Sequence, residues 1–165
     1  MARSIFYSFH YRPDNWRAAQ VRNMGVVDGN TPAKDNDWES ITKKGDTAIE
    51  SWIDGQLKGR SCSVVLIGAN TANRKWIDYE IKASWNSNKG LLGVYIHNLQ
   101  DVLEQQASKG ANPFSGFSIK NGTVSLSSVV KSYDPPYTDS KKVYAHIKAN
   151  LAAWIEEAVK IREGY

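Results

Sequence analysis

Residues 61–97 read "SCSVVLIGANTANRKWIDYEIKASWNSNKGLLGVYIH" and contain the pattern that decides the fold. Nearly continuous apolar runs at both ends of this stretch are typical of strands that are covered on both faces. Between them, Ile77, Ile81 and Trp85 recur every four residues, which is typical of a helix packed on a sheet. This stretch therefore predicts a strand at 61–68, a helix at 73–90 and a strand at 91–97.

The rest of the chain continues this alternation of strands and helices. Further strands are expected at 4–9, at 25–28 and within 124–134. Further helices are expected at 14–24 with Asp14 as its N-cap, at 46–59 and at 140–164. Alternation of this kind favours right-handed crossovers onto a mostly parallel sheet with helices on both faces, so we expect an α/β fold.

The length of 165 residues fits one domain, and no internal repeat divides the chain. We therefore expect a single domain over residues 1–165. Within it, residues 108–137 are rich in Gly and Pro and have the least regular pattern. This stretch is predicted to be an irregular insertion or a lid.

Charge and composition exclude several classes of protein. The net charge of +4 comes from 21 basic and 17 acidic residues without a block of like charges, so we expect no nucleic-acid partner. The 3 histidines and Cys62 lack zinc-type spacing, so we expect no metal, and Cys62 is predicted to be a core residue. No apolar stretch approaches the ~20 residues of a membrane span. A cytoplasmic protein without a membrane partner is expected.

Ligands of open parallel sheets bind beyond the carboxyl ends of the strands. Polar segments follow three of the expected strands, which makes that edge of the sheet the place to look for chemistry. Glu80, on the helix that follows the strand 61–68, is predicted to lie at the rim of the buried face, near Trp76. A purely structural interpretation pairs Glu80 with Arg74, Lys82 or Ser84 on the helix surface.

The motifs "FYSFHY", "CSVVLIG", "NRKWIDYEI" and "KGANPF" occur in this order between residue 5 and residue 114. In this combination the chain resembles the TIR-like proteins of the Thoeris anti-phage defence system. The resemblance implies a flavodoxin-like sheet and NAD as a substrate that is consumed. It also implies that Glu80, the glutamate of a W-x-x-x-E helix, is the catalytic residue. The product would be a cyclic ADP-ribose-type signal that activates a separate effector.

A single carboxylate is chemically sufficient for this reaction. Nicotinamide leaves from a cationic pyridinium as a neutral molecule, so no general acid is needed, in contrast to the pair of carboxyl groups in glycoside hydrolysis. A carboxylate beside the ribose stabilises the positive charge that develops on the sugar in the transition state.

Substrate-binding candidates follow the same strand ends. Two of them, Ser8 and His10, lie at the end of the first expected strand, while a basic side chain and several aromatic rings could hold phosphates and stack on bases. The full set of expected substrate-binding residues is Ser8, Phe9, His10, Arg12, Trp38 and Trp76. Taken one by one, the aromatic residues of this set are better explained as packing residues. The chain has no glycine-rich dinucleotide fingerprint, so NAD is expected as a substrate and no cofactor is expected.

Two other functions compete with an NAD-cleaving enzyme. A TIR-like fold could serve as a scaffold that self-associates and recruits partners, because a fold alone does not imply catalysis. A receiver-like protein is less compatible, because receivers need acidic residues clustered at the end of the first strand, and only Asp14 lies near it.

Overall fold

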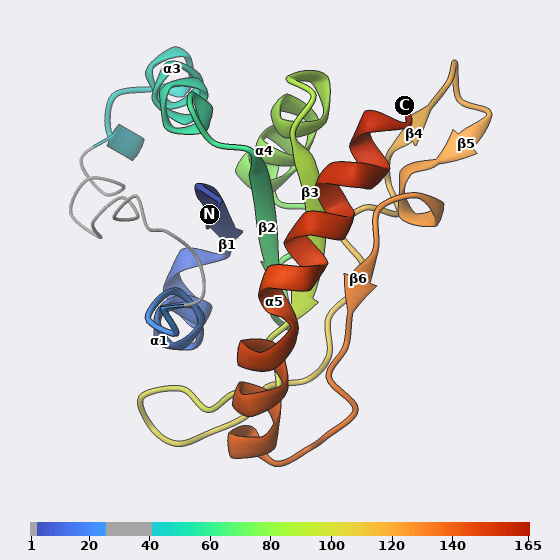
Figure 1. Ribbon diagram of the computed structural model, residues 1–165. Coiled ribbons are helices and arrows are strands. Elements are labelled where there is room, and N and C mark those ends of the chain that lie inside the picture. Colours follow the sequence, from blue (N-terminus) through green and yellow to red (C-terminus); the bar gives the residue numbers. More distant parts are fainter. Residues whose placement is uncertain (1–2, 26–40) are drawn as a thin grey trace.

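The computed structural model describes residues 3–25 and 41–165 and contains a parallel sheet at its centre (Figure 1). The strands follow the order β1-β2-β3-β6, and every neighbouring pair is parallel. Their bounds are β1 Ile5–Phe9, β2 Cys62–Ile67, β3 Gly90–Tyr95 and β6 Ser132–Tyr133. The expected mostly parallel α/β sheet of the flavodoxin-like class is confirmed. The strand expected at 25–28 lies outside the described residues except for Gly25.

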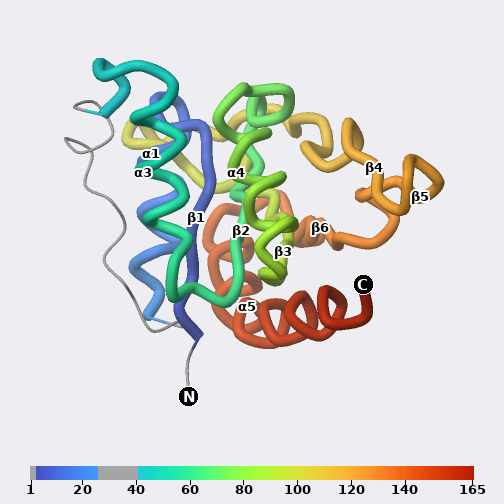
Figure 2. Tube along the Cα trace, turned by 90° about the horizontal axis from the view of Figure 1, so that it is seen from above, coloured from blue at the N-terminus to red at the C-terminus, as the bar shows by residue number. Residues whose placement is uncertain are grey.

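Helices cover both faces of this sheet. Their bounds are α1 Tyr11–Arg22, α3 Asp46–Leu57, α4 Lys75–Asn86 and α5 Ser140–Glu163. Figure 2 shows α4 and α5 on opposite sides of the strands, with α3 beside α4. The predicted helices at 46–59, 73–90 and 140–164 are confirmed, with shorter ends.

Side chains of β1 point alternately to the two faces of the sheet, and each face has its own layer of the core. Ile5 packs into the cluster under α1 and α5, while Phe6 packs into the cluster under α3 and α4. The central strands β2 and β3 are buried along their whole length, as the continuous apolar runs predict. Cys62 is fully buried there, and burial raises the pKa of its thiol to about 12, which confirms its role as a core residue.

The start of α1 differs from the prediction. The helix begins at Tyr11, with His10 as its N-cap, so the assignment of Asp14 as N-cap is wrong. Asp14 was predicted as the N-cap because it follows Pro13. Proline is nevertheless compatible with the first helical turn, where its missing N–H would have no helical acceptor. Asp14 therefore lies inside the first turn, and it is buried there.

The start of α4 is also displaced, by two residues, from the predicted position at 73. Asn73 has a positive φ of 65°, a left-handed conformation that cannot continue into a right-handed helix. The helix therefore begins at Lys75, after Arg74 as N-cap. This turn fixes the direction in which α4 crosses the sheet.

The segment 108–137 contains little regular structure. A strand within 124–134 is confirmed by the short β6, but the apolar run "VSLSSVV" at 124–130 is not part of it, because a 3-10 turn over Leu126–Ser128 interrupts this run. Instead, β4 (Ser118–Ile119) and β5 (Val124–Ser125) pair as an antiparallel hairpin. This hairpin lies beside the C-terminus, where Lys120 approaches the ring of Tyr165 (Figure 1). It is therefore at the amino ends of the strands, away from the edge where ligands of such sheets bind.

Three apolar side chains nevertheless anchor the segment 108–137 to the core: Phe114, Leu126 and Val130 are buried against α4. A mobile lid would not be expected to bury such side chains. Whether another part of the segment acts as a lid stays a prediction. No helix in the described ranges is both long and apolar enough to cross a membrane.

Replacing Phe114 with Ala tests this anchoring. Phe114 is fully buried, so we expect Phe114→Ala to lower the free energy of unfolding by about 3–5 kcal/mol, as measured by urea denaturation. Phe117→Ala, at a half-buried position of the same segment, is the control and should cost less. A Phe114→Ala protein as stable as the wild type would show that the segment is detached from the core.

Candidate active site

The centre of the candidate site is Glu80, which α4 presses against the sheet. The side chain is only 7% exposed, and its Oε2 atom is buried without a hydrogen-bond partner. The expectation that Glu80 lies at the rim of the helix's buried face is therefore wrong, because Glu80 belongs to the buried face of α4 together with Ile77, Ile81 and Ser84. Glu80 is a buried carboxyl group.

The end of β1 brings two further polar groups to this side of the sheet. Ser8 lies on the same face as Phe6, toward α3 and α4, and its Oγ atom is also buried without a partner. His10 follows in extended backbone (ψ 103°), so the alternation places it on the face of Ser8. Its Nδ1 atom is the third buried polar atom here without a partner.

Burial determines the protonation state of Glu80. Loss of hydration raises the pKa of its carboxyl group to about 8. The nearby Ser8 hydroxyl acts in the opposite direction and lowers this pKa, although the two groups do not reach hydrogen-bond geometry in this conformation. Glu80 therefore carries a proton at neutral pH, when no cation is close to it.

The structural interpretation of Glu80 as a surface ion-pair residue is not supported. Over residues 3–25 and 41–165, no ion pair forms with its carboxyl group. Ser84 does contact Glu80, but its hydroxyl donates to the Glu80 backbone carbonyl at 2.6 Å. The side-chain oxygens stay available for another partner.

The same serine fixes the position of Glu80 relative to the sheet. Because the single proton of Ser84 goes to the Glu80 carbonyl, the Ser63 hydroxyl of β2 donates to Ser84 Oγ at 2.7 Å. A buried chain of hydrogen bonds thus connects β2 with the backbone of α4 at Glu80. These hydrogen bonds hold the carboxyl group at a fixed height above β1 and β2.

His10 is uncharged at neutral pH. Partial burial lowers the pKa of its imidazole, and the positive charge of Arg74 lowers it further. Arg74 is itself exposed, at the start of α4, where its Nε atom donates to the Asn70 carbonyl at 3.1 Å. The site thus combines a neutral histidine, a protonated glutamate and an arginine at its entrance.

The other predicted substrate-binding residues occupy different places around β1, α1 and α4. Phe9 points to the opposite face of the sheet, where Arg22 lies over its ring at 5.3 Å. Arg12 is exposed on the first turn of α1. Trp76 lies one helical turn before Glu80 on α4 and packs beside Phe6 and α3, and its role in substrate binding stays a prediction. Trp38 lies outside the described residues.

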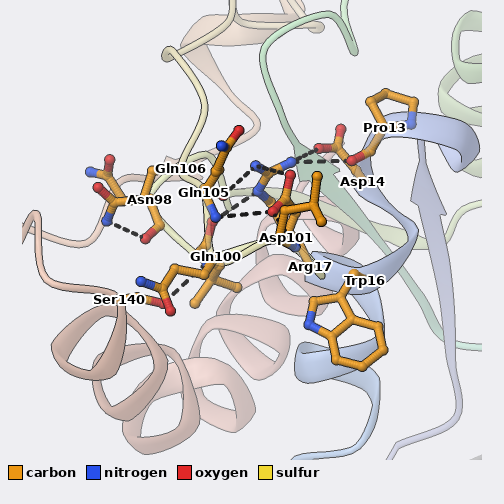
Figure 3. A network of polar contacts seen from close by, with 12 residues as sticks. Pro13, Asp14, Trp16, Arg17, Asn98, Gln100, Asp101, Gln105, Gln106 and Ser140 are labelled. Atoms are coloured by element: carbon orange, nitrogen blue, oxygen red, sulfur yellow. Dashed lines mark hydrogen bonds and ion pairs between the residues drawn. The ribbon is translucent and has the colours of Figure 1, made fainter.

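The buried pair of Asp14 and Arg17, which was not predicted, holds the loops at this edge together (Figure 3). The guanidinium group of Arg17 donates to Asp14 Oδ1 at 3.1 Å. It also donates to the carbonyls of Leu99 at 2.8 Å and Gln105 at 2.9 Å. The i,i+3 spacing of opposite charges indicated a pair, but nothing in the sequence indicated its burial.

Asp14 also explains why residue 68, directly after β2, is glycine. A Cβ atom on Gly68 would lie 2.1 Å from Asp14 Oδ2, which leaves no room for a side chain. The first turn of α1 therefore packs directly on the backbone that follows β2. This close packing sets the position of His10 next to the loop that leads into α4.

Comparison with known proteins identifies the family of the chain. The sequence profile of the family described as Thoeris protein ThsB, TIR-like domain, matches residues 6–101. The chain is also similar to a Bacillus cereus (strain MSX-D12) protein whose name designates a proposed cyclic ADP-D-ribose synthase, ThsB1. The identity is 37% over 119 residues, which cover 69% of this chain but only 62% of that protein's length.

The buried carboxyl group of Glu80 has a consequence for stability. Its pKa is raised to about 8 in the folded protein. Between about pH 4.5 and pH 8 the folded state therefore binds more protons than the unfolded state. The free energy of unfolding falls as the pH rises through this window. We expect Glu80→Gln to abolish this loss and to be more stable than the wild type at pH 8, by up to a few kcal/mol. Thermal denaturation between pH 5 and pH 9 measures the difference.

Glu50→Gln, on the exposed side of α3, is the matched control and should change stability little at any pH. Equal effects of the two substitutions, or a Glu80→Gln effect that does not depend on pH, would contradict the burial of an uncompensated carboxyl group.

Proposed function

Because the chain belongs to the TIR-like domain family of Thoeris ThsB proteins, we propose that it is a cytoplasmic enzyme that cleaves the bond between nicotinamide and ribose in NAD. NAD is the substrate and no cofactor takes part. The similar Bacillus cereus protein, named for cyclic ADP-D-ribose synthesis, supports a cyclic ADP-ribose-type product. In this proposal Glu80 is the catalytic residue, and Ser8 and His10 bind the substrate.

One observation carries this proposal: three buried polar atoms, Ser8 Oγ, His10 Nδ1 and Glu80 Oε2, lack hydrogen-bond partners at one end of β1. A buried polar group without a partner costs about 1–3 kcal/mol, and native proteins rarely tolerate several of them together. A ligand with hydroxyl and amide groups, such as a nicotinamide riboside moiety, would satisfy all of them. The cost in the free protein is explained if the site exists to bind such a ligand.

The burial of Glu80 also suits the charge of the reaction. The pyridinium ring of NAD is cationic, and a cation close to a carboxyl group lowers the pKa of that group. Substrate binding therefore favours release of the Glu80 proton. As nicotinamide leaves with the bonding electrons, positive charge moves from the ring to the ribose, and the carboxylate is already in place to stabilise it. Weak hydration strengthens this interaction.

Exclusion of water favours cyclisation over hydrolysis. An oxocarbenium-like ribose that water cannot reach is open to capture by another group of the same molecule. The site is closed in this conformation, since Glu80 Oε2 and Ser8 Oγ are both buried. Substrate can enter only when the site opens, so this opening is a natural point for control by infection. The cyclic product would then diffuse to a separate effector.

Self-association would be a second part of this function. Trp16 on α1 is 54% exposed, and Val102 and Leu103 in the loop after β3 are 65% and 72% exposed. The two regions are neighbours, because the Gln20 side chain donates to the carbonyls of both Trp16 and Gln100. An exposed apolar patch of this kind is typical of an interaction surface. A scaffold without catalysis would use the same patch and is the alternative function.

Product analysis distinguishes the enzyme from the scaffold. Purified protein at high concentration is incubated with NAD, with and without lysate of phage-infected cells, and the products are resolved by mass spectrometry. We expect release of nicotinamide and a product of cyclic ADP-ribose mass. Glu80→Gln should reduce the rate at least about 100-fold, because it removes the negative charge that stabilises the transition state.

Glu50→Gln is the control for this experiment and should retain full activity, since Glu50 is exposed on α3. An active Glu80→Gln protein would remove Glu80 from the chemistry. If the wild-type protein does not cleave NAD either with or without the lysate, the chain is a scaffold and its buried carboxyl group has no catalytic role.

A further inference from the structure

A second polar cleft lies at the carboxyl ends of β3 and β6, on the other side of β2 from Ser8. Its volume is about 490 Å³, within the range of small-molecule sites. One wall is formed by His97 and Asn98 after β3, and the other by residues 134–139, which connect β6 to α5. The first turn of α5, with Lys142, closes one end.

The walls of this cleft are held in place by hydrogen bonds. The Asn98 side chain donates to the Tyr137 carbonyl at 3.1 Å, and the Gln106 side chain donates to the Asn98 carbonyl at 2.8 Å and also to the Thr138 carbonyl. At the end of the cleft, Gln100 N–H donates to the Ser140 hydroxyl at 3.1 Å. These bonds join the loop after β3 to the entry of α5, so the cleft is preformed.

The end of the cleft at α5 is suited to an anion. This helix has 24 residues, and its first main-chain bond runs from Val143 N–H to the Asp139 carbonyl. The N–H groups before Val143 therefore have no acceptor within the helix, and the Asp139 side chain does not cap them. Lys142 adds a positive charge, and within the described ranges it forms no ion pair.

The floor of the cleft contains an independent sign of a ligand. His97 is only 7% exposed, and its Nδ1 atom is buried without a hydrogen-bond partner. Burial lowers the pKa of this imidazole, so the ring is neutral at pH 7. Tyr137, 42% exposed, and Pro135 and Pro136 add flat apolar surface beside it. A planar ring could pack here while an anionic group binds at α5.

The acidic residues around the cleft limit the charge of the ligand. Asp134 is neutralised by Lys109, whose Nζ atom lies 3.0 Å from its carboxylate. Asp139 is exposed at the rim and has no partner among the ion pairs of the described residues, so it repels anions. A monoanionic or dianionic phosphate therefore fits better than a chain of several phosphates.

This cleft is separate from the site at Glu80. Gly110 packs on the backbone that follows β2, and a Cβ atom there would lie 2.2 Å from the Gly68 carbonyl oxygen. This contact fills the carboxyl end of β2, which is the strand between β1 and β3. No mechanism that uses Glu80, Ser8 and His10 needs His97 or Lys142.

We propose that the cleft between His97 and Lys142 is a second ligand site, which binds a nucleoside monophosphate. Its phosphate group accepts hydrogen bonds from the first turn of α5 and pairs with Lys142. Its base packs against Tyr137 and the two prolines and forms a hydrogen bond with the Nδ1 atom of His97.

Titration of the full chain with AMP tests this proposal, with the imidazole ¹⁵N resonances of His97 as the local probe and adenosine as the ligand without phosphate. We expect AMP to shift the His97 resonances and to bind at least 10-fold more tightly than adenosine. Lys142→Glu should weaken AMP binding at least 10-fold. Asp139→Asn should tighten it, because this substitution removes the adverse charge.

Lys148→Glu, an exposed position on the same helix, is the matched control for the change in net charge and should bind AMP normally. Lys142→Glu should leave NAD cleavage unchanged. The proposal is overturned if AMP does not shift the His97 resonances at millimolar concentration or if adenosine binds as tightly as AMP. It is also overturned if Lys142→Glu and Lys148→Glu weaken binding equally, since binding would then be nonspecific.

Discussion

The buried pair of Asp14 and Arg17 is the interaction on which the carboxyl edge of the sheet depends. Arg17 is 4% exposed, and its guanidinium group joins α1 to the loop after β3 by hydrogen bonds to Asp14, Leu99 and Gln105. Removing one partner of such a buried pair typically costs about 3–5 kcal/mol. The pair fixes the first turn of α1, which begins directly after His10, and it fixes the loop that starts at His97. Both candidate sites are therefore built around one electrostatic contact.

The site at Glu80 illustrates how function can oppose stability. A carboxyl group without a partner, in contact with a buried serine, weakens the folded state at neutral and alkaline pH. The same burial gives the group a high pKa, weak hydration and a strong response to a cation. These are the properties that cleavage of a cationic nicotinamide riboside requires. The buried Glu80 carboxyl group thus lowers the stability of the fold and has the properties that the proposed reaction needs.

Much of the fold could be predicted from the sequence, because continuous apolar runs and four-residue spacing report burial directly. The strands β2 and β3 and the helix α4 between them were found in this way. The start of α1 was not, because Pro13 is equally compatible with a position before the helix and with its first turn. The 3-10 turn in the run 124–130 was also missed, because short apolar segments do not distinguish a strand from a turn with buried side chains.

The candidate site was only partly predictable. The position of Glu80 on α4 followed from periodicity, but its burial did not, because burial of a helix face depends on elements that lie far away in the sequence. Ser8 and His10 were selected because they lie at the end of β1, and alternation along the strand places them on the face of Glu80. The same alternation places Phe9 on the opposite face. It was not predictable that His97 and Lys142 line the same cleft, because this depends on how the segment 108–137 returns to the sheet.

A crystal structure of the Glu80→Gln protein with NAD would test the central claim most directly, because this substitution keeps the shape of the side chain and should slow cleavage. We predict that the nicotinamide riboside moiety lies within hydrogen-bond distance of Ser8 Oγ, His10 Nδ1 and the side chain at position 80. NAD bound elsewhere, with these three groups still buried and without partners, would contradict the assignment of the active site.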